Sequence, residues 1–190
     1  MWWSNVVAFQ VVAGFCAIAT ALVGGVFLAF SDFLMCSLEQ MDNGSETMKV
    51  INIKVFSLVF MPLFLWIVPI SLVLAGLGLF ILSHRPMKWL LFAGSLAYVS
   101  GVFLVTGAGN VPMNNRLADL KPGPDTEDYW RSTYLPKWTL LNTVRTVACV
   151  ASSSCFLLAV AVAPRNDPVR RPAATHAEAP ATAASHLISK

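Results

Sequence analysis

Between two long apolar runs the chain reads Gly109-Asn110-Val111-Pro112-Met113-Asn114-Asn115-Arg116, and the second run opens with Trp138, Asn142 and Arg145. Amides, cations and indoles are concentrated here, whereas apolar residues dominate most of the remaining chain. Trp138, Asn142 and Arg145 are spaced i, i+4 and i+7, so on a helix they lie along one face. An arginine inside an apolar helix costs roughly 2.5 to 3.5 kcal/mol on insertion scales and needs a partner. The pattern therefore predicts a polar site at the head of a membrane helix.

The composition is that of an integral membrane protein. Of the 190 residues, 56% are hydrophobic and 12% are charged, and the mean hydropathy is +0.65. A membrane helix needs about 20 apolar residues, and four runs meet this length or approach it: about 6–30, 55–82, 89–106 and 139–163. These runs predict an all-α, four-helix membrane bundle with a long ordered loop between the third and fourth helices. The bundle is expected to occupy residues 1–164, and residues 165–190 to form a disordered polar tail.

The short turn between the second and third runs carries Arg85 and Lys88 and no acid, and three arginines follow the fourth run. Basic residues of short loops favour the cytoplasmic side of a membrane. We therefore expect a multi-pass protein of the cell membrane with both termini cytoplasmic. Pro62 and Pro69 fall inside the second run, and each removes a backbone donor, which predicts a bent helix.

Other features exclude several classes of function. The net charge is only +3 and the cations are spread along the chain, so nucleic-acid binding is not expected. The four cysteines have no C-x-x-C spacing and are interpreted mainly as small buried thiols. His84 lies in a turn, and His176 and His186 lie in the tail, which argues against a histidine metal site. The sequence contains no nucleotide-binding motif, and neither a metal nor a cofactor is expected.

The four runs, the segment 109–117, Trp130, and the W-x-x-x-N-x-x-R pattern of residues 138–145 together resemble the anthrone oxygenase family. The resemblance covers about residues 12–163. Fungal members of this family are implicated in polyketide pathways, where they oxidise an anthrone to an anthraquinone with molecular oxygen. The resemblance thus implies a membrane-embedded, cofactor-free oxygenase, an oxidoreductase of the monooxygenase type, whose substrate is a polyphenolic or other apolar aromatic small molecule.

The residues suggest how such a reaction would proceed. An anthrone has an acidic C–H group, and its enolate is electron-rich enough to react with oxygen. We expect Arg145, with Asn142, to stabilise the enolate, and Asp32, an acid near the end of a membrane run, to act as the base. The amides near Arg145 are expected to donate hydrogen bonds to the phenolic oxygens of the substrate, and the other residues nearby to contact it as well. The expected binding residues are Asn110, Asn114, Asn115, Arg116, Trp130 and Trp138.

A structural interpretation of the same residues remains open. The asparagines would then cap helices, and Arg145 would pair with Asp32 to lock the bundle. In that case the protein is a non-enzymatic small-molecule-binding or bundle-interaction protein that uses the same pocket. A transporter is disfavoured because no inverted repeat is visible. Under either interpretation we expect the protein to contact the lipid bilayer. The sequence does not decide whether it forms a homo-oligomer.

Overall fold

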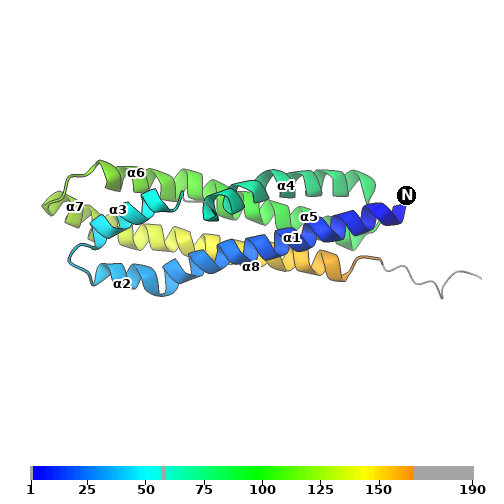
Figure 1. Cartoon of the computed structure of the whole chain (residues 1–190), viewed down its shortest axis with the longest axis horizontal. Coiled ribbons are helices and arrows are strands. Elements are labelled where there is room, and N and C mark those ends of the chain that lie inside the picture. The colour runs from blue at the N-terminus through cyan, green and yellow to red at the C-terminus, as the bar shows by residue number, and fades with distance from the viewer. Residues whose placement is uncertain (1, 57–58, 165–190) are drawn as a thin grey trace, which may run out of the picture.

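The structure is a computed structural model that describes residues 2–56 and 59–164. Four long helices, each apolar enough to cross a membrane, run side by side in alternating directions (Figure 1). The first comprises α1 (Trp2–Ala29), the π-helical turn η1 (Phe30–Leu34) and α2 (Met35–Glu39). The second is α4 (Phe60–Ile81), which the separate short helix α3 (Gly44–Lys54) precedes. The third comprises α5 (Arg85–Tyr98), η2 (Val99–Leu104), η3 (Thr106–Asn110) and α6 (Val111–Asp119). The fourth comprises α7 (Pro124–Tyr129), η4 (Trp130–Tyr134) and α8 (Leu135–Ala161). The predicted all-α membrane bundle is confirmed.

Three of the four long helices are longer than a membrane requires. The continuous helices 5–39, 85–119 and 124–161 contain 35, 35 and 38 residues. At 1.5 Å per residue the first of them is about 52 Å long, whereas the hydrocarbon core of a bilayer is about 30 Å thick. Their extra turns gather at one end of the molecule, together with α3 (Figure 1). We call this end, made of α2, α3, α6, α7 and η4, the polar cap.

Two boundaries differ from the sequence prediction. The second membrane helix begins at Phe60, so Pro62 falls in its first turn, where a missing N–H group costs little, and Pro69 is the proline inside α4. The predicted loop between the third and fourth helices is ordered but mostly helical, because α6 continues η3 directly and only residues 120–123 are non-helical. The predicted tail, residues 165–190, lies outside the described residues, and the domain boundary at residue 164 stays a proposal.

The core consists of three clusters along the bundle axis. The first, around Phe9, Leu91 and Phe156, joins the helices near the N-terminus. The second lies at mid-bundle around Phe64 and Tyr98, and the third fills the cap. Several buried hydroxyls in the membrane part bond to backbone carbonyls of neighbouring helices, and Tyr98 Oη, for example, donates to Phe64 O at 2.9 Å. Such bonds satisfy polar groups that no water reaches in a bilayer.

Cysteine burial is uneven. Cys16 and Cys149 are buried and Cys155 is half-buried, as the sequence indicated, but Cys36 is exposed on α2. Cys36 is exposed because α2 belongs to the polar cap.

Gly101 lies where the third and fourth helices approach closely. A Cβ atom on Gly101 would stand 2.5 Å from Ala148 Cβ, whereas one on Gly107, in the same helix, would meet nothing within 4 Å. Both Gly→Ala changes gain roughly 0.5 to 1 kcal/mol of helix propensity. We expect Gly101→Ala to lower the unfolding free energy by about 1 to 3 kcal/mol through overpacking, and Gly107→Ala not to lower it. Thermal unfolding of both variants in one detergent measures the difference, and equal midpoints would contradict the packing.

Candidate functional site

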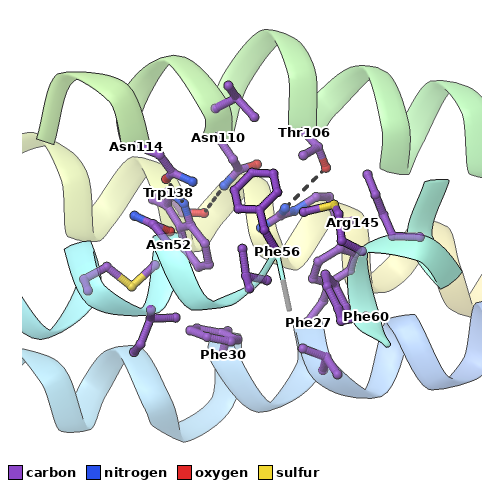
Figure 2. A pocket seen from close by; sticks show the side chains of 17 residues that line it. Phe27, Phe30, Asn52, Phe56, Phe60, Thr106, Asn110, Asn114, Trp138 and Arg145 are labelled. Atoms are coloured by element: carbon purple, nitrogen blue, oxygen red, sulfur yellow. Dashed lines mark hydrogen bonds between the residues drawn. The ribbon is translucent and has the colours of Figure 1, made fainter. Parts of the chain in front are cut away.

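A pocket lies where the membrane part of the bundle meets the polar cap. Its walls come from all four long helices and from α3, and Figure 2 shows their side chains converging on it. The lining residues with polar, charged or aromatic side chains are Phe27, Phe30, Asn52, Phe56, Phe60, Phe64, Thr106, Asn110, Asn114, Trp138 and Arg145. The cavity volume is about 90 Å³, below the roughly 300 to 1,000 Å³ of small-molecule pockets. A ligand of a few fused rings therefore does not fit entirely inside the cavity and would extend through its open side.

Arg145 is the charged group of this pocket and is only 4% exposed. Its Nη1 donates to Thr106 Oγ1 at 3.2 Å and its Nη2 to Asn142 Oδ1 at 2.6 Å. The guanidinium carbon lies 4.2 Å from the ring centroid of Phe27 and 5.1 Å from that of Trp138. Two aromatic faces thus stabilise the cation through its attraction to their π-electrons. These contacts hold the guanidinium in place but use only two of its five N–H groups.

No carboxylate neutralises Arg145 among the described residues. The ion pairs there are Lys49–Glu46 and Arg131–Glu127, and no described lining residue is acidic or a histidine. Asp32 is exposed on η1 and makes no ion pair with Arg145, so the alternative in which these two residues lock the bundle is wrong. Asp32 also does not line the pocket, which leaves the site with a net positive charge.

Asn142 is fixed by partners on the first helix. Its Nδ2 donates to Phe27 O at 2.6 Å and to Ser31 Oγ at 2.7 Å. Because a backbone carbonyl can only accept, the amide nitrogen must face the first helix and the amide oxygen must face Arg145. Asn142 therefore positions the guanidinium.

A second network joins the pocket to the cap. Asn114 Oδ1 accepts from Tyr134 Oη at 2.8 Å and from Trp138 Nε1 at 2.9 Å, and Asn52 Nδ2 donates to Tyr134 Oη at 3.2 Å. Asn110 Nδ2 donates to Trp138 O at 3.3 Å, and Asn110 Oδ1 has no partner. Trp138 is thus held through its indole N–H and its carbonyl against the guanidinium.

The spacing of Thr106, Asn110 and Asn114 places all three on the pocket wall. In an α-helix of 3.6 residues per turn, each step of four residues overshoots a full turn. The π-helical turn η3, Thr106–Asn110, takes more residues per turn, so it brings side chains four apart back into line. Local π-helical structure therefore builds this side of the site.

Several predicted residues lie elsewhere. Asn115 and Arg116 are exposed on α6 and do not line the pocket. Trp130 is fully buried in the cap core and stacks on Tyr134 at 5.2 Å between ring centroids. Trp130 therefore supports the stack beneath Trp138 rather than lining the pocket.

The structure also adds residues that the sequence analysis did not assign to the site, chiefly Phe27 and Thr106. The four-residue spacing from Thr106 to Asn114 was a readable signal for Thr106. No local pattern marks Phe27, because its contact with Arg145 crosses from the first to the last helix.

The fold and pocket define a class: small four-span membrane proteins in which a cation without a described carboxylate partner lies in an aromatic pocket beneath a helical cap. The sequence model described as anthrone oxygenase matches residues 54–155, more than half of the chain, and the chain belongs to the anthrone oxygenase family. The matched range includes Thr106, Asn110, Asn114, Trp138 and Arg145 but not Phe27. No curated protein and no solved structure matches the chain. Within residues 2–56 and 59–164, no group of three or more histidine, cysteine or acidic side chains is placed to hold a metal.

Replacing Asn142 tests the network around Arg145. Asn142→Leu removes the acceptor of Arg145 Nη2 and the donor to Phe27 O, and leaving such buried groups unpaired costs about 1 to 3 kcal/mol of unfolding free energy. The same change at exposed Asn115 should stay within about 0.5 kcal/mol. Thermal unfolding in detergent compares the two variants. A stable Asn142→Leu protein would show that the described bonds contribute little.

Proposed function

We propose that this protein is a cofactor-free membrane oxygenase that binds a polyphenolic, anthrone-like compound in the Arg145 pocket. The observation that carries the proposal is a buried guanidinium with unused N–H groups, aromatic walls and no carboxylate among the described residues. A flat aromatic oxyanion supplies the missing negative charge and matches the walls. Membership of the anthrone oxygenase family supports the same class of reaction.

The chemistry follows from the charge of the pocket. Loss of the C–H proton converts an anthrone into its enolate, and a fixed guanidinium stabilises this anion. The electron-rich carbon then takes up molecular oxygen, and loss of water leaves a carbonyl group, so that substrate and O₂ give a quinone and H₂O. In this proposal Arg145 contacts the oxyanion and Asn142 positions Arg145.

The proposal has no role for Asp32. No described lining residue is a carboxylate or an imidazole, so the pocket captures the ionised substrate instead of generating it with a lining base. The nearby positive charge favours the anionic form of an acidic ligand. A substrate whose enol ionises readily suits this site better than a weakly acidic one.

The rim of the pocket indicates where the substrate comes from. Val26, Phe56 and Val111 line it and are 38%, 70% and 41% exposed. Such exposed apolar side chains mark a surface that contacts lipid or an apolar ligand. We propose that the substrate reaches Arg145 from the bilayer, with its rings passing these three residues.

Arg145→Met tests this function. It keeps an unbranched side chain but removes the charge and all five donors, and we expect turnover of an anthrone under oxygen to fall by about 10²- to 10³-fold, the effect of losing a strong oxyanion donor. No described carboxylate loses its partner, but Asn142 Oδ1 does, so we expect a folded protein whose unfolding free energy falls by about 1 to 3 kcal/mol. Oxygen uptake and quinone absorbance measure turnover on purified protein in lipid nanodiscs.

Arg116→Met is the matched control, because Arg116 is an exposed cation of α6 and should keep full activity. Full activity of Arg145→Met, or its failure to fold, would contradict the proposal. Arg145-dependent binding of the anthrone without turnover would instead identify a non-enzymatic binding protein.

We also propose that both termini face the cytoplasm and the polar cap faces outward. The basic turn with Arg85 and Lys88 lies at the same end as the N-terminus (Figure 1), and basic short loops favour the cytoplasm. In a cysteine-free background, a cysteine at Asp125 should react with an impermeant maleimide on intact cells, whereas one at Lys88 should react only after lysis. The reverse pattern would invert the orientation.

A further inference from the structure

Two buried polar atoms of the pocket residues have no hydrogen-bond partner. In the described part of the chain, the buried side-chain atoms without partners are Thr20 Oγ1, Asn110 Oδ1 and Arg145 Nε. Asn110 and Arg145 both line the pocket, and they are opposite in kind, since one offers an acceptor and the other a donor. A ligand that satisfies both therefore carries an acceptor and a donor.

The orientation of the Asn110 amide is determined by its surroundings. Its Nδ2 donates to the backbone carbonyl of Trp138, and a carbonyl cannot donate in return. Asn110 Oδ1 is therefore the end that remains for a ligand, and Figure 2 shows it turned toward Thr106 and Arg145. Asn110 is 1% exposed, so bulk water does not satisfy this oxygen.

The oxygen atoms of Asn114 and Thr106, the next two polar residues along the same helix, are already engaged. Asn114 Oδ1 accepts from both Tyr134 and Trp138. The Thr106 hydroxyl donates to Val102 O at 2.7 Å and accepts from Arg145. A hydroxyl group on a ligand therefore has in Asn110 Oδ1 an acceptor that competes with no existing bond.

We propose that Asn110 is a specificity-determining residue that accepts a hydrogen bond from a neutral hydroxyl group of the ligand whose oxyanion Arg145 holds. This inference rests on the proposed function and refines its substrate class to aromatic monoanions that keep a hydroxyl group. It reverses the role expected from sequence, in which Asn110 donates to a phenolic oxygen. A ligand without the hydroxyl leaves Asn110 Oδ1 unpaired, and a doubly ionised ligand places negative charge against that oxygen, so the pocket selects against both.

Ligand pairs on the wild-type protein provide the test. The probes are the dihydroxynaphthalene isomers and their monomethyl ethers, the corresponding methoxynaphthols, measured without oxygen by fluorescence titration in lipid nanodiscs. A methyl ether keeps the oxygen and the ring but loses the donor. An unpaired buried acceptor weakens binding by roughly 5- to 140-fold. We expect at least one dihydroxynaphthalene to bind more tightly than its methyl ether by a factor in this range.

Two variants separate the roles of the two residues. Asn110→Leu, of similar size but without an acceptor, should remove the difference between the members of that pair. Arg145→Met should weaken the binding of both members. Because the ligand pairs are compared on wild-type protein, the test also stands if Asn110→Leu does not fold.

The outcomes distinguish this inference from the proposed function. Arg145-dependent binding in which no isomer differs from its methyl ether would overturn the role of Asn110 and leave the oxyanion pocket intact. A difference that persists unchanged in a folded Asn110→Leu protein would also overturn it. Absence of any Arg145-dependent binding of these naphthols would overturn the oxyanion pocket, and the role of Asn110 with it.

Discussion

The rest of the structure depends on how a permanently charged guanidinium is held inside an apolar bundle without a described carboxylate. Arg145 donates one hydrogen bond to Thr106 on the third helix and one to Asn142 on its own helix. Its guanidinium also lies over the aromatic ring of Phe27 on the first helix. The contacts that hold the cation are therefore also contacts that hold the helices together. The remaining N–H groups are available to a ligand because the helices themselves do not use them.

The depth of this cation is made possible by the length of the helices. If the helices ended at the membrane surface, Arg145 would lie within a turn or two of water. Here the helices continue into a cap with its own buried core, around Met48, Leu117 and Trp130. Its aromatic stack runs from Trp130 through Tyr134 to Trp138, with ring centroids 5.2 and 6.1 Å apart. The cap thus covers the pocket and keeps its dielectric low, which strengthens the interaction of the guanidinium with an anion.

Hydrogen bonding and shape act together in this site. Asn142 uses both ends of its amide, and Asn114 its amide oxygen, in bonds within the protein, which fixes Arg145 and Trp138 before any ligand arrives. Such preorganisation is what makes a donor effective at the moment when charge develops. The aromatic walls then limit the ligand to a flat shape, while the exposed apolar rim fits a compound that partitions into lipid. These features fit the proposed substrate, an apolar aromatic compound that becomes anionic.

The sequence by itself determined the membrane class, the number of spans and the cluster of Trp138, Asn142 and Arg145 on one helical face, because run length and helical spacing are local properties. It also identified Asn110 and Asn114 as pocket residues, through their position between two spans. Only the tertiary structure excluded Asp32 as the partner of Arg145 and turned Asn115 and Arg116 outward.

The positions of Asp32, Asn115 and Arg116 depend on the rotation of each helix about its axis. π-Helical turns change this rotation, and the periodicity of a single sequence does not report it. The tertiary structure likewise decided that Phe27 stacks on Arg145 and that Asn110 presents its oxygen. Both follow from contacts between segments far apart in the chain: the Asn110 amide is oriented by a carbonyl 28 residues away, and Phe27 meets a guanidinium on the last helix.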